Sequence, residues 1–401
     1  MSAPEAAAAP VLDLYGEDFR ADPHAVLGEL RARSWYAATP IGTAVLRYNE
    51  VQTLLSMREL RTPGADFLAM QGITDGPLVE TMRGFLLNAD GEPHNRVRRL
   101  VSKAFTVRRV EDFRPVIRDV ADELIANLAT REECDFIDAF AHPFALRVLC
   151  RFVGIPEDVQ AEVYRWTADV GLLFGFSVVE HGARIEAALA NLGVFIDELL
   201  DQRRGTPRDD LLSALVAAEE GGELLTDAEL RSMVITLMSA GQGTVQHQLG
   251  NAMSAFMAHP RQWRLLADEP RLAAKAADEV VRFCPSALLG LPRIAKIDIE
   301  LNDQPLPAGA CVLPITGSAN RDESVFEEPD TLNIARTRTT HLTYGGGIHY
   351  CLGAALAKAE LQEALPRLAT ALREPTPAGP GVWLPPTEAV YGPVHLPIHY
   401  S

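Results

Sequence analysis

One long helical pattern sets the strongest limit on how this chain can fold. Thr226 and Glu229 have the spacing of a capping box, and the pattern that they begin can continue to His259, before Pro260 stops it. Its roughly 32 residues would span about 48 Å at ~1.5 Å per residue. A helix of that length would cross the whole molecule.

The middle of this helix, Ala240-Gly241-Gln242-Gly243-Thr244, breaks the rules of helix propensity. Each glycine in a helix interior costs about 1 kcal/mol relative to alanine. Two glycines followed by a threonine indicate a place where the backbone lies against a flat object or bends locally. Close packing against another helix is the alternative explanation.

A second unusual stretch runs from Thr343 to Gly353 and contains three consecutive glycines, Gly345 to Gly347. Glycines suit a tight loop whose backbone must approach something closely. Cys351 ends the loop just before a helical pattern, where unpaired N–H groups and the helix dipole favour a thiolate. Cys351 is therefore a candidate metal ligand. A buried structural cysteine is the alternative, whereas a phosphate loop is disfavoured because no Gly-Lys-Ser/Thr follows.

Composition narrows the class of protein. The chain has 401 residues, 47% of them hydrophobic, and a net charge of −17, which argues against nucleic-acid binding. Its five cysteines are far apart and form no C-x-x-C pair, which fits a reducing cytosol rather than a disulfide scaffold or zinc site. Residues 1–22 read as a loosely ordered lead-in with neither a signal peptide nor a membrane span. We expect a cytoplasmic protein.

Most of the remaining chain has helical patterns, and the β signal, between Lys296 and Leu313, is small. The predicted fold class is mainly α with a small β region. Residues 94–109 contain six basic side chains and no acidic one, which indicates either a solvated helix face or a basic patch: Arg96, Arg98, Arg99, Lys103, Arg108 and Arg109.

These motifs, in this order, resemble those of the cytochrome P-450 family, and of its soluble bacterial class in particular. The resemblance covers about residues 12–400, so we expect one P-450 domain over residues 1–401, with haem between the long helix and the helix after the cysteine loop. It rests on four motifs: Tyr344-Gly345-x-Gly347-x-His349-x-Cys351-Leu352-Gly353, Glu279-x-x-Arg282, Ala240-Gly241-x-x-Thr244 and His94-Asn95-Arg96-Val97-Arg98-Arg99.

The resemblance assigns roles to single residues. It implies that Cys351 is the thiolate ligand of the iron of heme b (iron protoporphyrin IX) and that O2 is the co-substrate. The implied propionate contacts are His94, Arg98, Arg293 and His349, around the loop glycines Gly345, Gly347 and Gly353. Glu279, Arg282 and Arg336 would form structural ion pairs, and Ala240, Gly241, Gly243 and Thr244 would belong to the oxygen-binding side.

The chain departs from the family at Gly243, where an acidic residue usually precedes the threonine. That acid helps to deliver protons during oxygen activation, and proton transfer contributes typically ~10²–10⁴-fold to a rate. Ordered water, the substrate, or His247 or Gln248 on the next turn could replace it. Satisfied polar groups at a helix contact are an equally good description of His247 and Gln248.

The implied function is a haem monooxygenase that oxidises an apolar or aromatic small molecule in secondary-metabolite biosynthesis. Electrons would come from a separate ferredoxin and ferredoxin reductase that dock near Arg96, Arg99 and Lys103. The alternative is oxidative coupling, cyclisation or another non-hydroxylating oxidation by the same haem, which could act on a carrier-bound substrate. A peroxide-driven enzyme is disfavoured because no arginine lies beside Thr244, and a non-catalytic haem protein is disfavoured because Cys351 is present.

The substrate pocket would be formed by the 64–90 loop, the Leu172–Phe176 turn, the central helix and two later segments. Its predicted members are Phe85, Leu173, Phe174, His247, Leu288, Leu289, Val390 and Tyr391.

Overall fold

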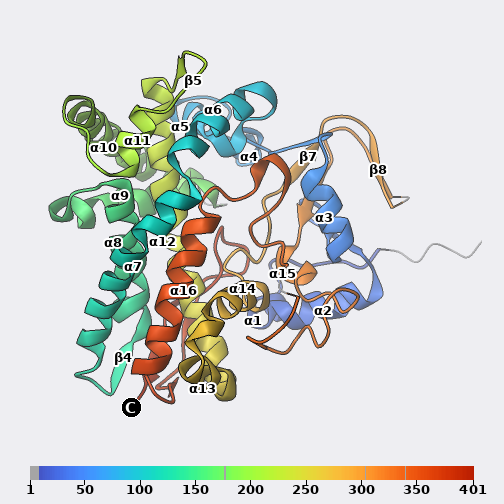
Figure 1. The fold of residues 1–401 in the computed structure, drawn as a ribbon. Coiled ribbons are helices and arrows are strands. Elements are labelled where there is room, and N and C mark those ends of the chain that lie inside the picture. The colour runs from blue at the N-terminus through green and yellow to red at the C-terminus, as the bar shows by residue number, and fades with distance from the viewer. Residues whose placement is uncertain (1–8, 176–177, 303, 339) are drawn as a thin grey trace, which may run out of the picture.

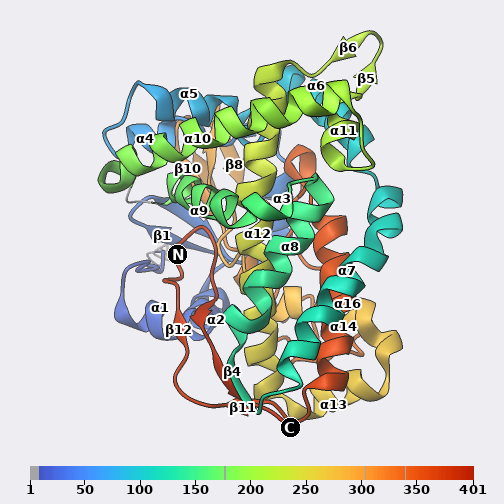
Figure 2. The same ribbon diagram turned by 90° about the vertical axis from the view of Figure 1, so that its left-hand side faces the viewer.

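Helix α12 (Asp227–Ala258) runs through the middle of the protein in a computed structural model, which describes residues 9–175, 178–302, 304–338 and 340–401 (Figures 1 and 2). Thr226 Oγ1 accepts from the Glu229 N–H at 3.2 Å, and the Glu229 carboxylate accepts from the Thr226 N–H at 2.8 Å. This capping box begins a helix of 32 residues. The predicted central helix is confirmed.

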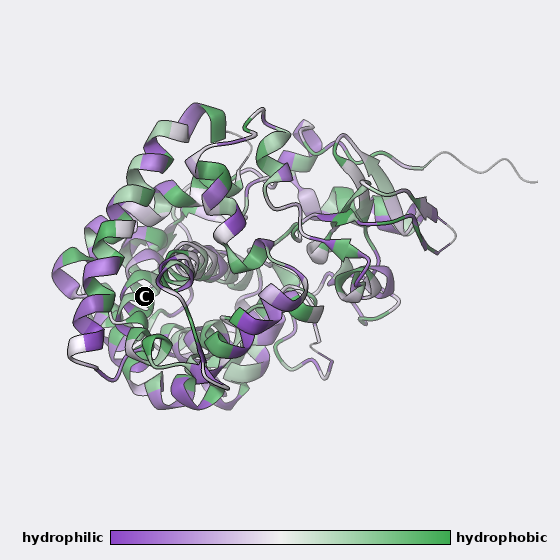
Figure 3. Cartoon of the chain, turned by 90° about the horizontal axis from the view of Figure 1, so that it is seen from above, coloured by the Kyte–Doolittle hydropathy of each residue, from purple (hydrophilic) through white to green (hydrophobic). Residues whose placement is uncertain are grey.

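Many of the other helices pack around α12. Polar and apolar residues are mixed along each helical ribbon, as expected when one face of each helix packs inward (Figure 3). In the described parts of the chain, none of the helices combines the length and apolarity that crossing a bilayer requires. The α-helices are α1 (Glu17–Ala21), α2 (Pro23–Arg33), α3 (Tyr48–Ser56), α4 (Asp66–Ala69), α5 (Pro77–Gly84), α6 (Gly91–Ala104), α7 (Val107–Leu128), α8 (His142–Val153), α9 (Gln160–Gly171), α10 (Val178–Gly205), α11 (Leu211–Val216), α13 (Pro260–Asp268), α14 (Ala273–Phe283), α15 (Thr316–Ala319) and α16 (Ala354–Ala371).

The β structure is small, as predicted, and is divided among separate sheets: β7 and β8 lie at the right of Figure 1, whereas β4 lies at the lower left and β5 at the top. Its largest sheet has the order β1-β2-β10-β7-β3, with β10 parallel to β2 and its other pairs antiparallel. The strands are β1 (Tyr36–Thr39), β2 (Gly42–Val45), β3 (Leu60–Arg61), β4 (Glu133–Asp135), β5 (Glu219–Glu220), β6 (Glu223–Leu224), β7 (Arg293–Ala295), β8 (Ile299–Leu301), β9 (Gln304–Leu306), β10 (Cys311–Pro314), β11 (Thr376–Pro377), β12 (Val382–Trp383), β13 (Pro393–His395) and β14 (Pro397–His399).

The N-terminal segment differs from the loosely ordered lead-in that we expected over residues 1–22. Residues 1–8 lie outside the described residues, but from residue 9 onward the segment is packed. Val11 forms a β-bridge with Ala38, and Leu12, Leu14 and Phe19 are fully or almost fully buried. The prediction was wrong for residues 9–22 because these apolar side chains join a hydrophobic cluster that includes the inner face of the sheet.

The two glycines in the middle of α12 have different surroundings. A Cβ on Gly241 would lie 3.0 Å from both methyl carbons of Leu149 on α8, whereas a Cβ on Gly243 would meet no atom of the described residues within 4 Å. Close packing against another helix therefore explains Gly241. It does not explain Gly243.

Candidate active site

The loop from Tyr344 to Gly353 depends on its glycines. Gly345 and Gly347 have φ values of +71° and +61°, a left-handed conformation that glycine adopts without steric cost. A Cβ on Gly347 would lie 2.7 Å from the Leu55 carbonyl oxygen, so α3 and the loop backbone are in close contact. The Cys351 N–H donates to the Tyr344 carbonyl at 2.9 Å and closes the loop.

Cys351 lies directly before α16, as expected, and backbone N–H groups of Gly353 and Ala354 point to its sulfur. Cys351 is exposed as a residue, yet its thiol is enclosed on most sides by protein. Burial raises the pKa of the Cys351 thiol, and the N–H groups and the Arg98 charge only partly oppose this effect. The helix start alone therefore does not favour the thiolate, although a bound metal cation deprotonates a coordinating thiol.

Four cationic or potentially cationic side chains lie near this loop. The His94 and His349 rings are 4.8 Å apart, and Arg98 donates to the Tyr350 carbonyl at 2.7 Å. Arg293, only 5% exposed, donates to the Leu291 and Pro292 carbonyls, each at 3.1 Å. Burial lowers the pKa of both Arg98 and Arg293.

Neither Arg98 nor Arg293 has a carboxylate within ion-pair distance among the described residues. Burying a charge is costly unless an opposite charge accompanies it. The donor set of two guanidinium groups and two imidazoles, beside an accessible cysteine, therefore fits a ligand that carries carboxylates. The two propionates of haem meet this requirement.

Asp90 also belongs to this group, although the sequence did not identify it. Its Oδ1 lies 3.2 Å from His349 Nε2. Burial lowers the pKa of His349 to about 4, the Arg293 charge adds to this effect, and Asp90 opposes it. Its position in the sequence could have identified it, because Asp90 is the N-cap residue of α6 and lies four residues before His94.

The predicted ion pairs form a buried cluster. Glu279 accepts from Arg282 Nε at 2.8 Å and from Arg336 Nε at 3.2 Å, and neither Glu279 nor Arg282 is exposed. Arg282 also donates to the carbonyls of Asn320 and Pro329, each at 2.8 Å. The cluster thereby ties α14 to the irregular segment that leads to the cysteine loop.

On α12, the Thr244 hydroxyl donates to the Ala240 carbonyl at 2.8 Å. Gly241 faces α8 through Leu149, so its missing side chain does not widen the space on the Thr244 side. Gly243 lies between Gly241 and Thr244 in the sequence, and the space at its Cβ position is open among the described residues. The structure thus brings Ala240 and Thr244 together. Gly241 differs from them, because it serves the contact between α12 and α8.

Comparison with known proteins agrees with this arrangement. Residues 169–373 match the model of the cytochrome P450 family. The chain is 35% identical to luteothin monooxygenase of Streptomyces thioluteus, over 98% of this chain and 96% of that protein. The chain belongs to the cytochrome P450 family. It is therefore an oxidoreductase of the haem-thiolate type, and the predicted fold class is confirmed.

Other cytochromes P450 support the same assignment. The mycinamicin IV hydroxylase/epoxidase of Micromonospora griseorubida is 38% identical over 71% of this chain and 72% of that protein. The crystal structure of CalO2 has a TM-score of 0.90, at 29% identity over 98% of this chain and 99% of that one. P450BioI, in complex with an acyl carrier protein that carries hexadec-9Z-enoic acid, has a TM-score of 0.88, at 25% identity over 96% and 99%.

His247 and Gln248, which could replace the missing acid of this cytochrome P450, have structural partners. His247 Nδ1 lies 3.1 Å from the Pro393 carbonyl. Gln248 donates to the Cys284 carbonyl at 3.0 Å and accepts from the Ser286 N–H at 3.0 Å. Gln248 is therefore a satisfied polar group at a helix contact, and it has no free group to relay a proton.

Apart from His247, the predicted pocket residues fall into two groups. Phe85 and Phe174 stack at 5.7 Å, beside the buried Leu173, and Gln71 links their segments by hydrogen bonds to the Gly175 carbonyl and the Val178 N–H, each 3.2 Å. The second group packs near the sheet: Leu288 is buried, Leu289 and Tyr391 are partly buried against the same cluster, and Val390 is half-buried. Phe176 lies outside the described residues.

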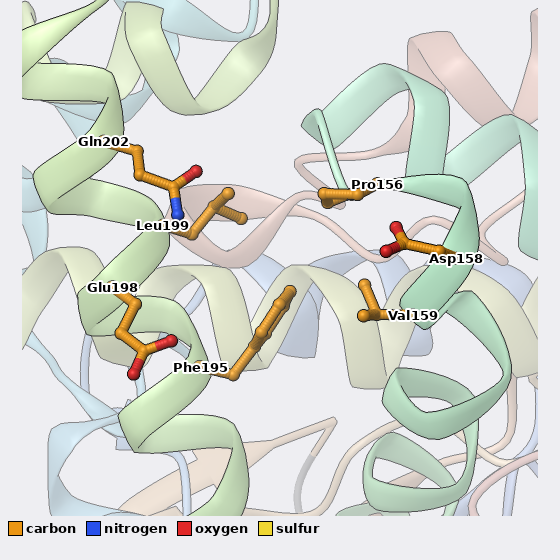
Figure 4. A pocket seen from close by; sticks show the side chains of 7 residues that line it. All are labelled: Pro156, Asp158, Val159, Phe195, Glu198, Leu199 and Gln202. Carbon is orange, nitrogen blue, oxygen red and sulfur yellow. The ribbon is translucent and has the colours of Figure 1, made fainter.

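A separate surface cavity of about 200 Å³ lies between α10 and the start of α9 (Figure 4). Its lining mixes apolar and acidic side chains: Pro156, Asp158, Val159, Phe195, Glu198, Leu199 and Gln202. None of the predicted haem or substrate residues belongs to it. We therefore do not include it in the active site.

Several side chains of the basic segment at residues 94–109 form ion pairs that the sequence did not show. Arg96 pairs with Glu229, while Arg99 lies 3.2 Å from Glu92. Lys103 lies 3.7 Å from Glu220 of the β5–β6 hairpin. Because these carboxylates come largely from distant parts of the chain, the local sequence could not show them.

Proposed function

We propose that this cytochrome P450 binds heme b through Cys351 and uses O2 to oxidise an apolar or aromatic small molecule of secondary metabolism. One observation carries the proposal: an exposed cysteine in a glycine-rich loop lies near the buried Arg293 and the half-buried Arg98, neither of which has a carboxylate partner among the described residues. A haem-thiolate group bound there supplies oxygen-activating chemistry. Binding the haem, holding the substrate and passing on protons are the tasks of the protein's own residues.

On the cysteine side, the side chains bind the haem and fix its orientation. Cys351 is the metal ligand, and the N–H groups of Gly353 and Ala354 hold its sulfur. Arg98 and Arg293 pair with the propionates, and His94 and His349 donate to them. Gly345 and Gly347 keep the loop backbone in the conformation that presents Cys351.

On the α12 side, the Thr244 hydroxyl and the Ala240 carbonyl form a hydrogen-bonded pair, from which the hydroxyl can pass on a proton. Phe85 and Phe174 offer aromatic surface for an apolar substrate. The relatives named for luteothin and mycinamicin IV act on natural products, which supports the same substrate class here.

Oxidative coupling or cyclisation is the second candidate, because the space at Gly243 admits a bulky substrate where the family usually has an acid. A carrier-bound substrate is compatible with either reaction, since the similar P450BioI forms a complex with an acyl carrier protein. Product analysis would distinguish an inserted oxygen atom from a new bond within the substrate.

Electrons are proposed to come from a separate ferredoxin and its reductase, docking near Arg96, Arg99 and Lys103. Arg99 and Lys103 are about half exposed, and exposed ion pairs contribute little net stability. An acidic partner can therefore replace Glu92 and Glu220 there. Arg96 is held more firmly, because both it and Glu229 are only about a quarter exposed.

A carbon monoxide difference spectrum of the reduced protein tests the cofactor. We expect the haem-thiolate signature in the unchanged protein and its complete loss in Cys351→Ala. Cys134→Ala, which removes a half-buried cysteine in β4, is the matched control and should keep the signature. An unchanged protein that takes up haem but lacks the signature would refute Cys351 as the ligand.

A further inference from the structure

His142 on α8 has an unusual pair of neighbours on α12. Its Nδ1 lies 3.1 Å from Gln246 Oε1 and 3.3 Å from Gln242 Nε2. Both glutamines are buried, and the Tyr164 ring of α9 packs edge-on against the imidazole at 4.4 Å. A short π-helix, η2 (Ile137–Ala141), directly precedes His142, and π-helical turns next to α-helices occur frequently at functional sites.

This environment satisfies Nδ1 whether or not it carries a proton. A protonated Nδ1 donates to the Gln246 carbonyl oxygen, and an unprotonated Nδ1 accepts from the Gln242 amide. His247 and His259 differ, because Nδ1 of each contacts one backbone carbonyl, which can only accept. His142 can therefore gain or lose the Nδ1 proton without losing a hydrogen bond.

The polar groups around His142 continue along α12 to Gly243. Residues three and four apart share a helix face, so Ser239 and Gln246 both neighbour Gly243 on the α12 surface. The Ser239 hydroxyl oxygen is buried and has no hydrogen-bond partner among the described residues. Beside it, the Cβ position of Gly243 is open. A buried hydroxyl next to open space is a place where water can bind.

We propose that His142 is the proton-relay residue of this enzyme and that it works through water bound at Ser239 and Gly243. The inference rests on the proposed function, because the proton is needed for oxygen reduction near Thr244. The half-buried imidazole takes up a proton from the solvent side at one ring nitrogen and releases one from Nδ1 to this water. Only N–H and O–H bonds change, and no electron moves. Gln242 and Gln246 are positioning residues.

The imidazole tautomer gives a test that does not depend on turnover. In the reduced, carbon monoxide-bound protein, nitrogen NMR of labelled histidine reports whether Nδ1 is protonated. Gln242→Leu removes the donor, so Nδ1 should become fully protonated, and Gln246→Leu should have the opposite effect. One unchanged His142 tautomer in the unchanged protein and both variants would overturn the proposal.

Oxygen uptake tests the relay itself and needs no substrate. A plant-type ferredoxin and its reductase supply electrons, and O2 takes up two electrons and two protons to give hydrogen peroxide. Because each turnover consumes protons, His142→Phe and Ser239→Ala should each slow O2 uptake by about tenfold, which is less than the ~10²–10⁴-fold that proton transfer can contribute. Adding Gly243→Asp to His142→Phe should restore most of the rate.

His259→Phe, at the far end of α12, is the control and should leave O2 uptake unchanged. Unchanged uptake in both His142→Phe and Ser239→Ala would overturn the relay. If His142→Phe does not fold, Ser239→Ala and the two glutamine variants still decide the question. Absence of the carbon monoxide signature in the unchanged protein would instead refute the proposed function, so the two failures can be told apart.

Discussion

The cysteine loop and the middle of α12 both depend on glycine, but for different reasons. In the loop, a left-handed backbone and the contact with Leu55 require Gly347. In α12, close contact with Leu149 explains Gly241, while none of the described residues lies close enough to explain Gly243. The glycines of the loop are thus required by its backbone conformation, which presents Cys351. For this reason the sequence motif of the loop identifies the cofactor. The role of the glycines in α12 depends on what occupies the space beside the helix. The sequence motif of α12 therefore does not identify the type of oxidation.

The largest expected effect tests whether the loop side is held rigid by its buried ion pairs. Glu279→Ala leaves Arg282 and Arg336 without their carboxylate, and breaking a buried pair in this way costs about 3–5 kcal/mol. Urea unfolding of the haem-loaded protein measures the loss. Glu300→Ala, an exposed glutamate on β8, should change little. A Glu279→Ala protein as stable as the unchanged one would show that the cluster does not support the loop.

The next prediction concerns haem affinity. Arg293→Leu replaces a buried cation proposed to pair with a propionate, so we expect haem to be lost about 10–100-fold more readily, the range typical of residues that support a metal group. Transfer of haem to apomyoglobin gives the rate. Arg58→Leu, at an exposed position, serves as the control. Equal transfer rates for both variants would remove Arg293 from the propionate site.

The two glycines of α12 can be compared directly. The new Cβ of Gly243→Ala meets no atom within 4 Å in the part of the chain that the structure describes, so this variant should be more stable by about 0.5–1 kcal/mol through helix propensity. Gly241→Ala gains the same propensity but forces Leu149 to move, so it should be destabilising by about 1 kcal/mol or more. Thermal unfolding measures both. The same sign for both variants would contradict the distinction between the two positions.

The smallest expected effect concerns the surface. Arg99→Glu and Lys103→Glu should slow reduction by ferredoxin several-fold at low salt and less at high salt, because the interaction is between exposed charges. The haem spectrum should stay intact. Stopped-flow reduction at two ionic strengths measures this change, with Arg108→Glu, which is almost fully exposed, as a comparison. Identical rates for all three variants would place the docking surface elsewhere.

Much of the fold and cofactor site could be predicted because its signals are local in sequence. The capping box at Thr226, the spacing around Cys351 and the Glu279–Arg282 pair each lie within a few residues. The features that were missed depend on distant partners, such as Leu149 for Gly241 and Asp90 for His349. His142 was missed for the same reason, since its two glutamines are about 100 residues away.

The parallel pairing of β2 with β10 has a consequence for biosynthesis. Thr43 pairs with Val312, and the Tyr48 N–H donates to Asp322 at 2.8 Å, so β2 and α3 complete these contacts with segments made late in translation. Pairings this distant in the chain form slowly. Since Leu55 also contacts the cysteine loop, we expect the nascent chain to capture haem only after its final quarter has left the ribosome.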